Sequence, residues 1–111
     1  MATIFVDVSA YLVFAYGGPN GNNNVAASIS LTIPNAFAFL DFYPEGTPLP
    51  PLRQATHASG RQIYYVSYRY EQLANVLDLL RNEKPIKFFY RDDNLAAYLT
   101  TADEPVGEGE S

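Results

Sequence analysis

Apolar and polar residues alternate along much of the N-terminal half of the chain, and this period of two is the strongest constraint on the fold. It begins with the apolar residues Ile4, Val6 and Val8, which fall on the opposite side of an extended chain from Asp7. The alternation returns after residues 17–24. An alternation of period two predicts strands that bury one face. The chain is therefore expected to be rich in strands.

Four strands are predicted from this pattern, over residues 3–16, 25–33, 35–43 and 62–69. The first reads as one long strand with a single buried face. The third alternates Ala with Phe and has aromatic residues on both sides, which leaves two interpretations. Either it is a central strand with both faces covered, or its Phe side chains contact another subunit.

Two segments between these strands are predicted to be loops. Residues 17–24 are Gly and Asn around one Pro, a composition typical of a turn between strands. Residues 44–60 form the longest irregular segment and begin with a cluster of prolines at 44–51. This cluster favours a rigid surface connection, with a polyproline ligand for an aromatic groove as the alternative.

Residues from about 70 to 82 are expected to form the one helix. Leu73, Val76 and Leu80 fall on one side at helical spacing, and polar residues fall opposite them. Pro85 then prevents the helix from continuing.

A hairpin of two strands, over residues 86–91 and 95–101, is expected to follow the helix. A turn with an even number of residues would put Phe88 on the same face as Leu99, whereas a three-residue turn would put it with Tyr98. We favour the even turn, because it gathers the most apolar side chains on one face.

The expected fold is α+β, with a curved antiparallel sheet or a partly open β-barrel of five to six strands. The order β-β-β-α-β-β with one helix is also that of an OB barrel. At 111 residues the chain is long enough for one ordinary core, so residues 1–101 are expected to form a single domain. Residues 102–111 are acidic and contain Gly and Pro, and they are expected to be a flexible tail.

Several function classes are excluded or disfavoured by composition. The absence of Cys rules out disulfides, thiolate metal sites and Cys nucleophiles. His57 is the one histidine, it lies in the Pro-rich loop, and no motif places a base and an orienting group beside it. We therefore expect no enzyme, no cofactor and no metal site; a small hydrolase built from dispersed carboxylates stays a third hypothesis.

The N-terminus lacks the basic region of a secretory signal, and no run is apolar and long enough to span a bilayer. These two observations predict a soluble cytoplasmic protein.

Charge is unevenly distributed along this acidic chain, whose net charge is −5. All seven Lys and Arg residues lie between residues 53 and 91, whereas residues 1–52 have none. Cations and aromatic residues interleave on one side of the strand over 62–69 and on the outward side of the hairpin. We hypothesise that these side chains form one binding face, made of Arg61, Tyr65, Arg69, Lys87, Phe89, Arg91 and Tyr98.

Two partners suit such a face. Arg and Tyr are enriched in protein interfaces, and protein partners impose no sign of charge, which favours a non-enzymatic interaction protein that forms a homodimer or binds another protein. Single-stranded DNA or RNA is the alternative, because rings stack on bases and cations contact phosphates. The acidic net charge opposes the alternative at long range.

Overall fold

The computed structural model describes residues 3–18, 21–91 and 96–101. In chain order, the elements in these residues are β1 (Thr3–Asp7), β2 (Ala10–Ala15), β3 (Ala27–Ile33), β4 (Ala36–Tyr43), β5 (Arg53–Thr56), β6 (Gln62–Arg69), the 3-10 helix η1 (Tyr70–Gln72), α1 (Leu73–Asn82), β7 (Ile86–Arg91) and β8 (Ala96–Thr101).

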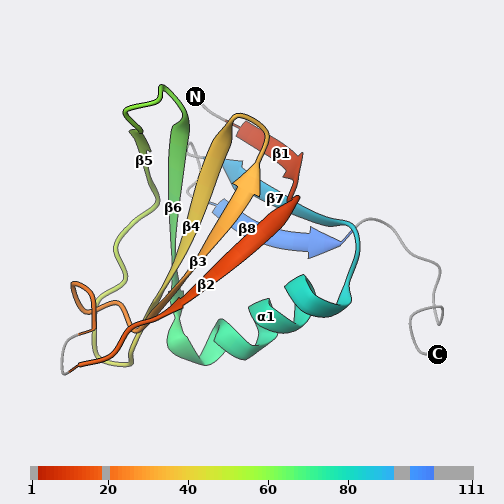
Figure 1. Ribbon diagram of the computed structural model, residues 1–111. Coiled ribbons are helices and arrows are strands. Elements are labelled where there is room, and N and C mark those ends of the chain that lie inside the picture. The colour runs from red at the N-terminus through yellow and green to blue at the C-terminus, as the bar shows by residue number, and fades with distance from the viewer. Residues whose placement is uncertain (1–2, 19–20, 92–95, 102–111) are drawn as a thin grey trace.

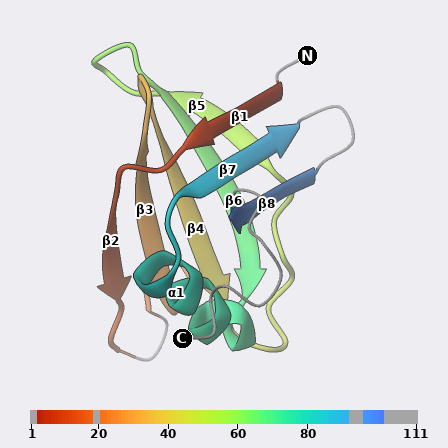
Figure 2. The ribbon, with the colours of Figure 1, turned by 90° about the vertical axis from the view of Figure 1, so that its right-hand side faces the viewer.

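The strands form two sheets that are not closed into a barrel. The larger sheet has the order β2-β3-β4-β6-β5, and the smaller has the order β1-β7-β8 (Figure 1). All neighbouring strands are antiparallel except β4 and β6, which run parallel. The smaller sheet and α1 both lie on one side of the larger sheet (Figure 2). The predicted α+β class with mostly antiparallel strands is confirmed, although the strands are divided between two sheets.

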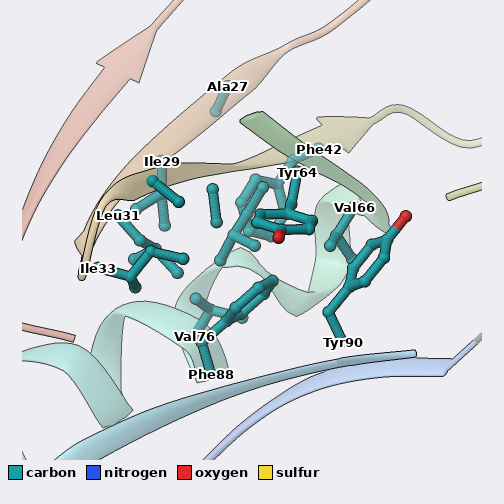
Figure 3. Packing of buried hydrophobic residues seen from close by; sticks show 13 residues of the cluster. Ala27, Ile29, Leu31, Ile33, Phe42, Tyr64, Val66, Val76, Phe88 and Tyr90 are labelled. Atoms are coloured by element: carbon teal, nitrogen blue, oxygen red, sulfur yellow. The ribbon is translucent and has the colours of Figure 1, made fainter. Parts of the chain in front are cut away.

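The core lies between the two sheets and α1. Strands β3, β4 and β6 point alternate side chains inward, among them Ile29, Leu40 and Val66, all of which are buried. Phe88 and Tyr90 enter this core from β7, and Figure 3 shows both of them directed toward the larger sheet. The alternation that predicted the strands thus also fixes which side of each strand is buried.

The prediction of one strand over residues 3–16 is wrong. The chain turns at two residues, where the amide of Val8 donates to the carbonyl of Ile86 (2.9 Å) in the smaller sheet and that of Ser9 donates to Thr32 (3.0 Å) in the larger. β1 and β2 therefore belong to different sheets. The alternation continues across this corner, so periodicity alone does not reveal it.

The corner also changes the side to which the apolar residues point. In β1, Ile4 and Val6 pack against the core. In β2, Leu12 pairs with Ser30 and Phe14 with Ser28, and since Ile29 and Leu31 point inward, this side of β2 points away from the core. The face of β2 predicted to be buried is thus exposed, and Leu12 is 59 % accessible.

Strands β7 and β8 pair in the predicted register. Phe88 lies opposite Leu99 and Phe89 opposite Tyr98, as an even turn requires. The turn itself, at residues 92–95, lies outside the described residues, as does the predicted tail at 102–111.

The predicted helix over residues 70–82 is present as η1 followed by α1. Val76 is buried, and Leu73, Leu77 and Leu80 pack against the core from the same side of the helix. No helix in the described part of the chain is long and apolar enough to cross a membrane.

The predicted loop over residues 44–60 is wrong at its centre, where β5 forms. This strand of four residues pairs with β6, so that Arg53 lies opposite Tyr65. Its sequence, RQAT, has no apolar alternation, and the strand exists because β6 offers an open edge for pairing. In the other predicted loop, Asn23 and Asn24 adopt positive φ angles of 53° and 69°, as expected of Asn in a turn.

Substitution of Phe88 and of Phe89, which are neighbours on β7, tests which face of this strand is buried. We expect Phe88→Ala to lower the free energy of unfolding by about 3–5 kcal/mol, because the ring is fully buried between the sheets. The control is Phe89→Ala, which removes the next ring on the opposite face and should cost about 1–2 kcal/mol. Urea unfolding followed by circular dichroism measures both, and equal losses would contradict the assignment of faces.

Candidate functional site

The structure divides the predicted binding residues between two faces. Arg61 and Tyr65 lie at or in β6 on the larger sheet, whereas Phe89 and Tyr98 lie in the smaller sheet. The two sheets pack with their inner faces together, and Tyr64 contacts Tyr90 across the core with ring centroids 4.8 Å apart. On β6, Tyr65 alternates with the inward Tyr64, and on β7, Phe89 alternates with the inward Tyr90. The side chains of Tyr65 and Phe89 therefore point to opposite sides of the molecule. The hypothesis of one continuous face is wrong for this geometric reason.

On the smaller sheet, the outward side chains mainly contact one another. The ring of Phe89 stacks on Tyr98 at 4.6 Å and meets the edge of Phe5 at 6.3 Å. Lys87 donates to Asp7 at 2.7 Å and lies 5.4 Å from the Phe5 ring. Arg91 closes this strand and also has an interaction partner. The cation of Lys87 is thus already paired, which leaves this face less suited to bind an anion.

The larger sheet has a broad outward side, which we call the outer face. Strand register places one row across it, Leu12, Ser30, Phe39, Tyr65 and Arg53, one residue from each strand. Neighbouring rows add Phe14, Ser28, Asp41 and Ser67 on one side and Ala10, Thr32, Phe37, Ile63 and Ala55 on the other. The smaller sheet and α1 lie on the other side of this sheet, so neither covers these rows.

Cations and rings do interleave on the outer face. The Arg53 guanidinium lies 3.9 Å from the Tyr65 ring centroid, and Phe39 stacks on Tyr65 at 5.7 Å. Arg61 lies 4.9 Å from the Phe37 ring. Arg69 differs, because it donates to the carbonyls of Pro44 (3.1 Å) and Thr47 (2.6 Å) and so anchors the loop that follows β4.

A hollow of about 330 Å³ opens on the outer face around Asp41. Tyr16, Phe39, Tyr43 and Tyr65 contribute rings to its lining, together with the Arg53 side chain. The Asp41 carboxylate accepts a hydrogen bond from Ser28 Oγ at 2.8 Å. Burial raises the pKa of Asp41 above its ordinary value, while the Ser28 hydrogen bond and the Arg53 charge act to lower it. The pKa of the Tyr43 hydroxyl is also raised, first by the burial of Tyr43 itself and then by the nearby charge of Asp41.

The lone histidine lies in a local turn. His57 is exposed, its Nδ1 accepts the amide of Ser59 at 3.1 Å, and the Ser59 hydroxyl lies 3.0 Å from the same nitrogen. Both contacts span two residues of the chain, as in a turn. Among the described residues, no group of three His, Cys, Asp or Glu is placed to hold a metal ion.

Sequence reasoning missed four residues of this site: Leu12, Phe14, Asp41 and Arg53. The alternation assigns Leu12 and Phe14 to a buried face, and Arg53 lies in a segment predicted to be a loop. Asp41 did leave a signal, because it is the one charged residue in the otherwise apolar segment 36–43. A charge inside a central strand needs a polar partner, which Ser28 supplies.

Comparison with known proteins identifies no relative: no family model, no curated protein and no solved structure matches the chain.

The raised pKa of Asp41 predicts a pH dependence of stability. The carboxyl has an ordinary value of 3.8, and its pKa is higher in the folded chain, so ionisation costs more there than in the unfolded chain. The resulting stability is complete below 3.8 and is lost as the pH rises through the folded-state pKa. We expect Asp41→Asn to raise the free energy of unfolding at pH 7 and to leave it nearly unchanged at about pH 3.

Urea titrations at the two pH values measure this difference. Ser28→Ala provides the complementary control, because loss of the donor should destabilise the charged carboxylate at pH 7 more than the neutral carboxyl at about pH 3. An Asp41→Asn variant that is less stable than the unmodified chain at pH 7 would contradict the prediction.

Proposed function

We propose that this chain is a non-enzymatic interaction protein that self-associates through β2, at the end of the larger sheet, and the outer-face residues beside it. The observation that carries the proposal is the exposure of Tyr11, Leu12, Val13 and Phe14 in succession, each between 36 % and 59 % accessible. Contiguous exposed apolar side chains mark contact surfaces in folded proteins.

Charge supports a protein partner. The sequence has no Asp, Glu, Lys or Arg from residue 8 to residue 40, a stretch that includes β2 and β3. Two copies of a chain with net charge −5 repel each other, and the repulsion is smallest where the contact itself is uncharged.

We place the protein in the cytoplasm, since a chain without Cys has no need of an oxidising compartment.

Sedimentation equilibrium from about 1 μM to about 1 mM tests self-association, because mass action populates a weak dimer only at the upper end of this range. We expect the weight-average mass to rise from one chain toward two. Leu12→Glu should reduce this rise, whereas Phe5→Glu, at a residue of similar exposure (53 %) on the smaller sheet, should not. A mass of one chain throughout, or equal effects of the two variants, would refute the proposal.

Single-stranded nucleic acid is the second candidate, favoured by the two Arg groups that lie over rings on the outer face. Its earlier support from the element order of an OB barrel is lost, because the sheets do not close into a barrel. The acidic net charge argues against it.

Fluorescence anisotropy with a labelled single strand of about 16 nucleotides separates the two candidates. The self-association proposal predicts no binding at low salt or at about 0.2 M salt. Binding that weakens with salt, is lost in Arg53→Ala and persists in Lys87→Ala would instead establish the nucleic-acid function. Lys87 is the matched control because it lies on the opposite side of the molecule.

A further inference from the structure

Strand β2 ends the larger sheet, and one of its edges has no neighbouring strand in the described part of the chain (Figure 2). The amide of Tyr16 donates to the carbonyl of Ala26 at 3.0 Å. In an antiparallel pair, hydrogen-bonded residues alternate, so the backbone groups of Leu12 and Phe14 also face β3. Those of Tyr11, Val13 and Ala15 therefore point outward along the open edge.

This edge lacks the features that keep edge strands from pairing. Charged residues, Pro, bulges and short length protect natural edges. The other end of the same sheet has such protection, because β5 has only four residues and begins with Arg53. By contrast, β2 has the sequence AYLVFA, six uncharged residues that are all exposed.

Both sides of the edge are also open. Leu12 and Phe14 lie on the outer face, and Tyr11 and Val13 lie on the side of α1. A hollow of about 710 Å³ lies between the start of β2 and the end of α1, and its lining includes Tyr11, Leu80 and Ile86. A strand added to β2 would therefore gain apolar contacts above and below the sheet as well as backbone hydrogen bonds.

We infer that β2 pairs antiparallel with β2 of a second copy about a two-fold axis, so that the larger sheets of two chains become one. Val13 lies at the axis opposite Val13 of the second copy, and Tyr11 lies opposite Ala15. This register uses every outward backbone group of the strand. The inference rests on the proposed self-association and names its interface.

The second copy is favoured over a strand from another protein for two reasons. An antiparallel edge is self-complementary, because each copy presents the same donors and acceptors in reverse order. The edge is also uncharged, and residues 8–40 of either copy bring no charge to it. On the outer face, this register sets Leu12 of one copy beside Phe14 of the other, which covers the most exposed of the four large apolar side chains at positions 11–14.

The contact is of modest size. With accessibilities between 36 % and 59 %, even complete burial of the four apolar side chains at positions 11–14, together with the paired backbone, gives at most an interface on the order of 700 Å² over both copies. Standard stable interfaces bury at least about 1,200 Å². The dimer is therefore expected to be weak and dependent on concentration.

Single cysteines in this Cys-free chain test the interface and its register. Directly paired strand residues have Cα atoms about 5.5 Å apart, within the range of a disulfide, so Val13→Cys should cross-link to itself across the axis. Leu12→Cys is the matched control, because the two copies of residue 12 are diagonal neighbours about 7–8 Å apart, beyond easy bridging. Phe5→Cys is the control for random collision.

We expect Val13→Cys to form the intermolecular disulfide at least about tenfold faster than either control under mild oxidation of the folded chain. In urea, which unfolds the chain, all three variants should form the disulfide at the same rate. We also expect Val13→Lys to stay monomeric at concentrations where the unmodified chain and Phe5→Lys associate. Far-ultraviolet circular dichroism confirms that each variant is folded.

The outcomes are distinguishable. A rising mass combined with equal cross-linking rates, or with association that survives Val13→Lys, overturns β2 pairing and leaves self-association standing. Faster cross-linking of Leu12→Cys than of Val13→Cys overturns this register, because it puts residue 12 rather than residue 13 at the two-fold axis. A mass of one chain at every concentration overturns both proposals and excludes the second copy as the occupant of the edge.

Discussion

The contact of Tyr64 on β6 with Phe88 and Tyr90 on β7 joins the two sheets, and the rest of the structure depends on it. The ring centroids lie 6.4 Å and 4.8 Å apart, and Phe88 and Tyr90 are 0 % and 1 % accessible. Because the smaller sheet and α1 cover the same side of the larger sheet, the main cluster of buried apolar side chains lies on that side. The outer face of the larger sheet is what this arrangement leaves uncovered, although its side chains include Phe37, Phe39 and Tyr65.

The corner between β1 and β2 is the reason why β2 lies at an exposed edge of the larger sheet. β1 must reach β7 in the smaller sheet, while β2 continues along β3 in the larger, and the hydrogen bonds of Val8 and Ser9 hold the chain between them. β2 thereby occupies an outer position where neither the helix nor the smaller sheet covers it. The apolar alternation that drives β1 into the core is preserved in β2, where it brings exposure instead of burial.

Much of the fold follows from local pattern, and the rest depends on which strands become neighbours. Alternation and helical spacing predict β3, β4, β6 and α1, and the register of β7 with β8 follows from matching apolar faces. Periodicity states which residues of one strand share a side, but not to which sheet that strand belongs. The prediction that Tyr65 and Phe89 share a surface fails for this reason, as does the single strand over residues 3–16. β5 is missed because its stability comes from pairing with β6 rather than from its own sequence.

The outer face and the β2 edge are compatible as parts of one surface. Pairing at the edge uses backbone groups that lie in the plane of the sheet, whereas the hollow around Asp41 opens perpendicular to that plane. The hollow therefore stays open when two edges meet. The charges follow the same division: residues 8–40, which include β2 and β3, carry none, and Asp41 and Arg53 occur only farther along the sheet. In the proposed dimer, the uncharged edges of two acidic chains would meet, and the charged half of each sheet would lie at the far ends of the paired sheet.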